Sequence, residues 1–165
     1  MNNRGVSQIV GVAVLIGLTV ALVAAVWGIL NAFVLDRLDT AEACNQILDK
    51  VSFNNEYVCH NVTDGGNYTL VSVNIADIDV DEILISVNYE NENKVIRLTN
   101  QSRAIDGVTY YQSSLTEVSM PSKEGGRTYV VESNEKPESI EVSPKIKGVQ
   151  CDITDKIESI PNCIN

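Results

Sequence analysis

VSQIVGVAVLIGLTVALVAAVWGILNAFVL, residues 6–35, is a run of thirty amino acids without a formal charge, and it decides how the chain is organised. It follows Arg4-Gly5 and ends at Asp36-Arg37. Eighteen or more uncharged, mostly apolar residues indicate a membrane-spanning helix, because a helix satisfies its own backbone hydrogen bonds in hydrocarbon. At 1.5 Å per residue the stretch would measure about 45 Å, against roughly 30 Å of hydrocarbon. Crossing a bilayer therefore does not by itself explain its length.

An N-terminal position, a basic residue at the start and an apolar run after it are also typical of a secretory signal peptide. The apolar region of a signal peptide has only about 7–15 residues, however, and a small-residue cleavage site follows it. Here the apolar region is about twice as long, and Asp36-Arg37-Leu38-Asp39 follows it. We therefore expect the helix to remain in the mature protein.

Helical periodicity continues beyond the first charges. Apolar side chains recur in steps of three and four, which predicts one apolar stripe with polar residues on the other faces. The sequence thus predicts a single helix over residues 6–52, apolar on all sides over 6–35 and amphipathic afterwards, ending before Asn54-Asn55. The stripe consists of Val34, Leu38, Ala41, Cys44, Leu48 and Val51.

Charge separates the two parts of the chain. All 22 acidic residues and 11 of the 12 basic residues lie beyond Leu35, which gives that part a formal charge of −11. Such a surface repels the phosphates of nucleic acids, so we expect no nucleic-acid partner. Arg4 on one flank and acidic residues on the other place the N-terminus in the cytoplasm and the remainder outside. Its length suits one domain, and we assign it residues 53–165.

This domain shows the period of strands. Residues 71–75 and 83–89 alternate between apolar and polar side chains, which indicates half-buried strands. Turn-rich segments separate seven candidate strands, and no helical pattern lies between them. We expect an α+β protein in which the long helix precedes an antiparallel, immunoglobulin-like β-sandwich. The other candidate strands are 94–99, 108–112, 128–132, 139–142 and 145–150.

Four cysteines, Cys44, Cys59, Cys151 and Cys163, fit an exterior location. Their number is even, and no pair has the CxxC spacing of a zinc or redox site. Three pairings are possible. We favour Cys44–Cys59 and Cys151–Cys163, because each closes a short loop, and the alternative is four reduced, buried thiols.

The N-terminal sequence, Arg4-Gly5 followed by residues 6–12 and 15–20, resembles that of archaeal type IV pilins. The resemblance implies a leader of residues 1–5, cut between Gly5 and Val6 by a prepilin peptidase. It also implies assembly by a cytoplasmic ATPase and a membrane platform protein, with the precursor held in the cytoplasmic membrane and the mature subunit in a filament at the cell surface. Bacterial pilins usually have Glu at the fifth mature position, where this chain has Val10; archaeal pilins generally lack that glutamate.

A helix that is apolar on all sides also needs apolar surroundings on all sides, either lipid or identical neighbours. We therefore expect a structural subunit that polymerises with itself for adhesion, surface attachment or motility. Two alternatives remain. One is a membrane-tethered, non-polymerising exterior domain, either a minor pilin or a surface-binding module, and the other is an archaellin of a rotating filament. The residues assigned to polymerisation are Val6, Ile9, Val10, Gly11, Leu15, Gly17, Leu18, Leu22, Trp27, Gly28, Leu30 and Phe33.

Smaller motifs add little. Asn61, Asn67 and Asn100 begin N-x-[ST] acceptors for glycosylation, in about the number that composition alone produces. Asp77, Asp79 and Asp81 could gather calcium, although aspartates between strands are more often turn residues. The single histidine, His60, has no base or nucleophile partner in sequence, and the usual catalytic motifs are absent from the sequence. We expect no enzyme activity, cofactor or metal.

Overall fold

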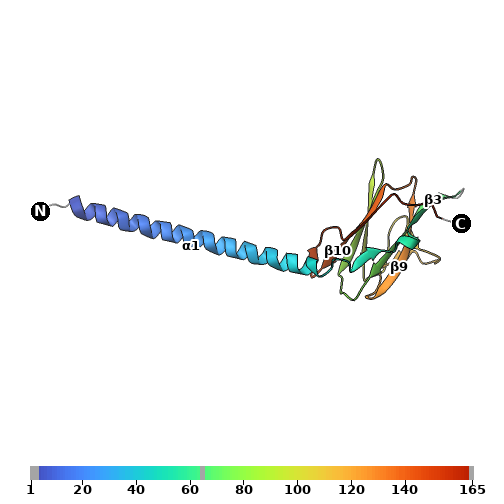
Figure 1. Cartoon of the computed structure of the whole chain (residues 1–165), viewed down its shortest axis with the longest axis horizontal. Coiled ribbons are helices and arrows are strands. Elements are labelled where there is room, and N and C mark those ends of the chain that lie inside the picture. The colour runs from blue at the N-terminus through green and yellow to red at the C-terminus, as the bar shows by residue number, and fades with distance from the viewer. Residues whose placement is uncertain (1–3, 64–65, 164–165) are drawn as a thin grey trace. The chain divides into compact units, whose positions relative to one another are not determined.

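A computed structural model describes residues 4–63 and 66–163, without the side chains of residues 4–9 and 35–40. The chain divides into two compact units, Met1–Ala41 and Glu42–Asn165. The first unit contains most of the helix, and the second, here called the head, contains the strands (Figure 1). Residues 1–3 of the predicted leader lie outside the described residues.

Helix α1 spans Arg4–Asn45, so the prediction that the helix reaches Ser52 is wrong. After Asn45 the chain makes a turn over residues 46–50, in which Asp49 has φ 62°. Aspartate is one of the few residues that adopt this left-handed conformation readily. The conformation is not helical, so residues 46–50 do not continue α1. Leu48 is then exposed rather than on the apolar stripe, and Val51 begins a strand.

Five strands form the first sheet of the head, and all of them pair antiparallel. Strand β3 lies in its centre and pairs with β9 over nine residues, from Asn67↔Ser133 to Ile75↔Gly125. The other side of β3 pairs with β2 at one end and with β1 at the other. The strands are β1 (Val51–Phe53), β2 (Cys59–Thr63), β3 (Gly66–Ile75), β7 (Val108–Tyr110) and β9 (Gly125–Ser133).

The second sheet has the order β11-β10-β4-β5, with β12 also paired to β10. Its strands are β4 (Glu82–Asn88), β5 (Asn93–Thr99), β10 (Ser139–Ile146), β11 (Val149–Gln150) and β12 (Asp155–Glu158). Short strands β6 (Arg103–Ala104) and β8 (Glu117–Val118) form a separate pair, and a 3₁₀ turn, η1, covers Asn55–Tyr57.

The two larger sheets share one hydrophobic core. Buried side chains of β3 and β9, such as Val73 and Tyr129, belong to the same cluster as Ile85 of β4 and Ile140 of β10. Ala43, from the last turn of α1, is also buried in this cluster. The predicted α+β class, a long apolar helix followed by antiparallel sheets, is confirmed.

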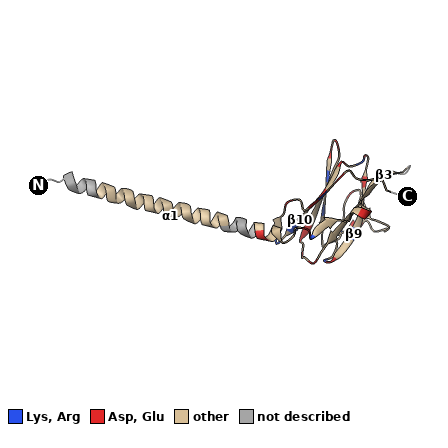
Figure 2. Ribbon diagram, in the orientation of Figure 1, with Lys and Arg blue, Asp and Glu red and all other residues tan. Residues whose placement is uncertain are grey.

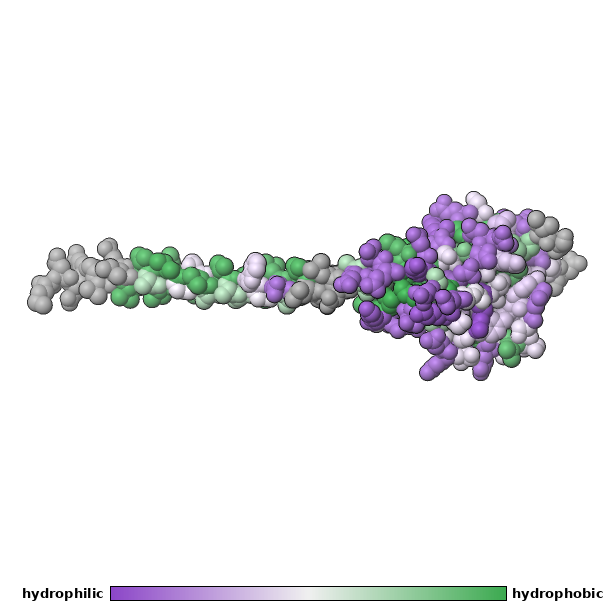
Figure 3. Space-filling model, turned by 60° about the horizontal axis from the view of Figure 1, so that its bottom comes forward, coloured by the Kyte–Doolittle hydropathy of each residue, from purple (hydrophilic) through white to green (hydrophobic). Residues whose placement is uncertain are grey.

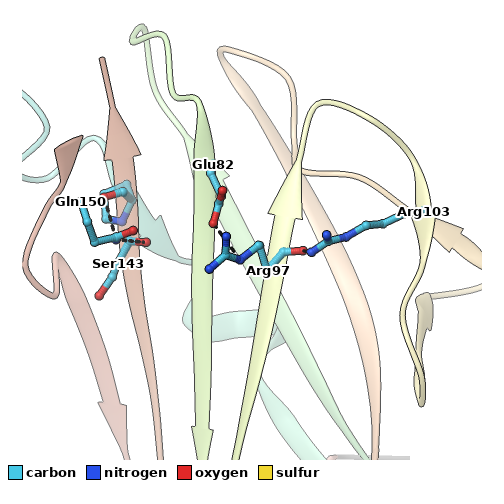
Figure 4. A network of polar contacts seen from close by, with 6 residues as sticks. Glu82, Arg97, Arg103, Ser143 and Gln150 are labelled. Carbon is cyan, nitrogen blue, oxygen red and sulfur yellow. Dashed lines mark hydrogen bonds and ion pairs between the residues drawn. The ribbon is translucent and has the colours of Figure 1, made fainter. Parts of the chain in front are cut away.

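Polar contacts fasten the second sheet at its edges (Figure 4). Glu82 of β4 pairs with Arg97 of β5 at 3.1 Å, and Arg103 donates to the carbonyl of Arg97. On the opposite side, the Gln150 amide donates to the carbonyls of Ser143 and Pro144. We predicted two strands, 139–142 and 145–150, but β10 continues through Pro144 to Ile146.

The chain reverses after β10 at Lys147-Gly148. Both residues have positive φ, 49° and 78°. This is the signature of the two-residue type I′ hairpin turn, which places β11 beside β10. The turn therefore lies inside the segment that we predicted as a strand.

Candidate functional site

The apolar part of α1 is the feature of this chain with the most evident capacity for interaction. Residues Val10–Val34 are long and apolar enough to cross a membrane, and none of this window is buried inside the structure. The space-filling view shows hydrophobic colour along α1, whereas the visible face of the head is largely hydrophilic (Figure 3). Exposure reaches 71% at both Trp27 and Ile29. Side chains of this kind are stable only when something apolar covers them.

Little on this segment needs water. Between residues 10 and 34 no Asp, Glu, Lys or Arg occurs, and the first acidic residue of α1 with a described side chain is Glu42 (Figure 2). The hydroxyl of Thr19 donates to the carbonyl of Ile16 at 2.9 Å, so this side chain satisfies itself within the helix. Satisfied polar groups are a requirement for a helix in a water-free environment.

Most residues assigned to polymerisation lie in this exposed segment. Gly5, Val6 and Ile9 belong to α1, but their side chains lie outside the described residues. The others are all exposed, namely Val10, Gly11, Leu15, Gly17, Leu18, Leu22, Trp27, Gly28, Leu30 and Phe33.

Two disulfides stabilise the head, and their pairing differs from the prediction. Cys44 bonds to Cys151 and Cys59 to Cys163, with sequence separations of 107 and 104. We favoured short loops, but the fold brings distant segments together. Cys44, in the last turn of α1, meets the residue that follows β11, with a Cα–Cα distance of 5.4 Å.

The second disulfide fastens the C-terminal segment to β2. The backbone N–H of His60 donates to the carbonyl of Pro161, and the N–H of Cys163 donates to the carbonyl of His60. This short parallel pairing leaves Cys59 and Cys163 side by side, with a Cα–Cα distance of 4.9 Å. Closing a loop of about 100 residues contributes about 4.7 kcal/mol in the chain-entropy model, more than the short loops would.

His60 is a buried residue of the head. It is 2% exposed, and its Nδ1 lies 3.0 Å from the hydroxyl of Thr69. Burial, followed by the positive charge of Lys136, lowers the pKa of His60 below its ordinary value. The residue is therefore neutral in the folded head at neutral pH.

The three asparagine acceptors have different surroundings. The Asn61 amide donates to the hydroxyl of Tyr68 at 2.7 Å, and the Asn67 amide donates to the carbonyl of Asn134 at 3.1 Å. Both residues are half-buried, whereas Asn100 is exposed in the bend after β5. Asn100 is thus the most accessible of the three.

The aspartates after β3 do not gather around one point. Lys123 pairs with Asp77 at 2.9 Å and with Asp79 at 3.7 Å, whereas Asp81 accepts from the backbone N–H of Gly148. Within the described residues no group of three His, Cys, Asp or Glu side chains is placed to hold a metal ion.

Comparisons with protein families, with curated proteins and with solved structures give no match. The function therefore has to be argued from the helix and the head themselves. An N-terminal apolar helix indicates membrane anchoring or a signal sequence, and two disulfides indicate an extracellular head.

Proposed function

We propose that this chain is a structural subunit of an extracellular type IV pilus-like filament, in which α1 helices of many copies pack together. The observation that carries this proposal is the exposure of α1. Fifteen large apolar side chains between Val10 and Val34 are each at least 49% exposed. Covering them in a filament would contribute on the order of tens of kcal/mol per subunit, before ordering costs.

The placement of small residues on α1 supports packing against other helices. Ala13, Gly17, Ala21, Ala24 and Gly28 follow one another in steps of four, four, three and four, which puts them on one face of the helix. A Cβ added at Gly17 or Gly28 would have nothing within 4 Å, so no contact with the described residues explains these glycines. Small residues at this spacing let helix backbones approach closely where there is no water.

The head supports the proposal through its strand order. The first sheet has the order β1-β3-β9-β7 and the second has β11-β10-β4-β5. Lettered in chain order with β2 and β12 set aside, these orders correspond to A-B-E-D and G-F-C of an immunoglobulin-like sandwich, with β5 in the place of the additional strand C′, which supports this fold for the head. We propose that the head is immunoglobulin-like, as in the pilins that the N-terminus resembles.

The proposal includes a route to the filament. A prepilin peptidase would cut between Gly5 and Val6, and a cytoplasmic ATPase with a membrane platform protein would move the subunit out of the cytoplasmic membrane. The rival function is a membrane anchor that holds one exterior domain. It shares the exposed helix, but it needs neither the cut after Gly5 nor the stripe of small residues.

The N-terminus of the native protein tests the proposal. Intact-mass spectrometry of material sheared from cells that make the chain should find Val6 as the first residue and the chain as a main component of filaments. Gly5→Phe should block the cut and leave the protein in the membrane, whereas Asn2→Ala, a matched change within the leader, should not. An uncut Met1 start, with all of the protein retained in the membrane, would favour the anchor.

A further inference from the structure

A surface groove of about 780 Å³ lies beside strands β7, β8 and β9 of the head. Its volume falls within the roughly 300–1,000 Å³ that is typical of ligand-binding clefts. Hydroxyl and aromatic side chains line much of it, including Ser102, Tyr111, Ser113 and Thr128. One cation, Arg127, also lines the groove.

Arg127 is held by Tyr110 and Ser119, which also line the groove. Its Nη1 donates to the hydroxyl of Tyr110 at 2.7 Å and to Oγ of Ser119 at 2.9 Å. Its guanidinium carbon lies 4.9 Å from the centre of the Tyr110 ring. Tyr110 is fixed in turn, because its hydroxyl accepts from the backbone N–H of Ser119 at 2.7 Å. Burial raises the pKa of Tyr110, but hydrogen bonds from Ser119 and the charge of Arg127 outweigh burial, so the pKa is lowered.

Among the described residues, the other two nitrogens of the guanidinium, Nε and Nη2, have no hydrogen-bond or ion-pair partner. A guanidinium carries five N–H donors, and the two hydrogen bonds of Arg127 both use Nη1. No carboxylate of the described residues lies within 4 Å of it, although Glu117 lines the same groove. Arg97, by contrast, pairs with Glu82. Nε and Nη2 of Arg127 therefore form a fork with the geometry that a carboxylate accepts in two parallel hydrogen bonds.

We propose that this groove binds an acidic saccharide, with the sugar carboxylate on the Nε–Nη2 fork of Arg127. The lining favours a sugar, because hydroxyl groups such as those of Ser113 and Ser102 can exchange hydrogen bonds with sugar hydroxyls. Tyr111, 43% exposed, offers a ring for the apolar face of a sugar.

The lining of the groove separates this ligand from an acidic peptide. The part of the chain beyond Leu35 carries a formal charge of −11 and disfavours any polyanion, so charge alone does not select the ligand. A uronic acid adds ring hydroxyl groups that can exchange hydrogen bonds with Ser102, Ser113 and Thr128, and a glutamate side chain has none. The site lies wholly in the head, so this proposal does not depend on whether α1 polymerises.

Calorimetry on the full chain in detergent tests the site. The probes are trigalacturonate, neutral maltotriose and a triglutamate peptide, at 150 mM salt, where the Debye length is about 8 Å. We expect saturable binding of trigalacturonate, weakened at least tenfold by Arg127→Gln and partly by Arg127→Lys. Arg97→Gln, which removes the same charge outside the groove, should change the affinity less than twofold, and maltotriose should not bind.

Other outcomes would overturn the proposal. Absence of trigalacturonate binding, or equal binding by the Arg127→Gln and Arg97→Gln variants, would mean that Arg127 has only a structural role, through its hydrogen bonds to Tyr110 and Ser119. Binding of triglutamate as tight as that of trigalacturonate would point to a peptide instead. Because Arg127 also supports Tyr110, thermal unfolding of each variant is measured in parallel. The exposed Tyr111→Ala variant gives a second test, with binding expected to weaken while the unfolding temperature stays the same.

Discussion

At the scale of single residues, His60 is a buried side chain of the head that can take up a proton. It lies next to Cys59 in β2, is almost fully buried, and contacts the hydroxyl of Thr69. Desolvation opposes its protonation in the folded state, whereas an unfolded chain would protonate it freely. This difference makes the stability of the head dependent on pH.

The sign of this dependence follows from proton linkage. The pKa of His60 is lower in the folded head than the ordinary value of 6.5, so the unfolded chain binds more protons below about pH 6.5. The contribution of neutral His60 is fully present above that pH and is lost as the pH falls towards the folded-state pKa. Urea unfolding between pH 7.5 and 5 should show this loss, and His60→Gln should flatten this part of the profile. An identical slope in the variant would mean that other groups cause it.

The three glycosylation acceptors should differ in occupancy. Asn100 is exposed, whereas the amides of Asn61 and Asn67 are hydrogen-bonded within the head. In a host that glycosylates N-x-[ST] sites, glycopeptide mass spectrometry should find Asn100 as the most occupied position. Asn100→Gln should remove most of the added mass, and Asn61→Gln should remove little. Predominant occupancy of Asn61 would show that modification precedes folding.

At the scale of elements, α1 has a stripe of small residues, Ala13, Gly17, Ala21, Ala24 and Gly28, all of which are exposed. Replacing Gly17 and Gly28 by Leu should leave the folded head unchanged, because a Cβ at either position meets nothing within 4 Å. The same changes make the helix more apolar, so a plain anchor would insert at least as well as before. The filament, by contrast, should lose close helix contacts.

Electron microscopy and membrane fractionation separate these outcomes. The Gly17→Leu, Gly28→Leu variant should reach the membrane normally and form few or no filaments, and the conservative change Val20→Leu should form them normally. If the double variant forms filaments as well as the original chain does, the small-residue stripe is not part of the assembly interface.

The disulfides are the second element-scale test. Non-reducing peptide mapping should recover Cys44 linked to Cys151 and Cys59 linked to Cys163, and should not find the short-loop pairs. Changing both Cys59 and Cys163 to Ser should lower the free energy of unfolding by about 2–5 kcal/mol, as is typical for a native disulfide. Recovery of a peptide linking Cys44 to Cys59 would contradict the observed topology.

These elements show what the sequence could predict and what it could not. The alternation of apolar and polar residues predicted β4 correctly, because one face of that strand is buried and the other is half-buried. It missed β12, whose pattern of half-buried and exposed residues includes no fully buried position. The helix ends at Asn45, before a turn that contains the left-handed residue Asp49, and the cysteine pairing depends on long-range topology. The groove at Arg127 was missed because its residues come from separate strands and loops, and no local motif links them.

At the scale of the whole molecule, two compact units carry two different properties. The head has its own core and a strongly acidic composition, and its two disulfides favour a location outside the cell. In the helical unit, the described side chains of residues 10–34 are all exposed, and most of them are apolar. Such a helix needs either lipid or copies of itself around it. We propose that lipid surrounds the helix of the precursor and that neighbouring copies surround the helix of the mature subunit.

Removal of detergent from the processed protein tests this central claim most directly. The chain starting at Val6, purified in detergent and then transferred to buffer alone, is followed by analytical ultracentrifugation and electron microscopy. The account predicts rapidly sedimenting filaments of uniform width with the α1 helices bundled along the axis. Stable monomers in detergent-free buffer, with folded heads and no large species, would contradict it.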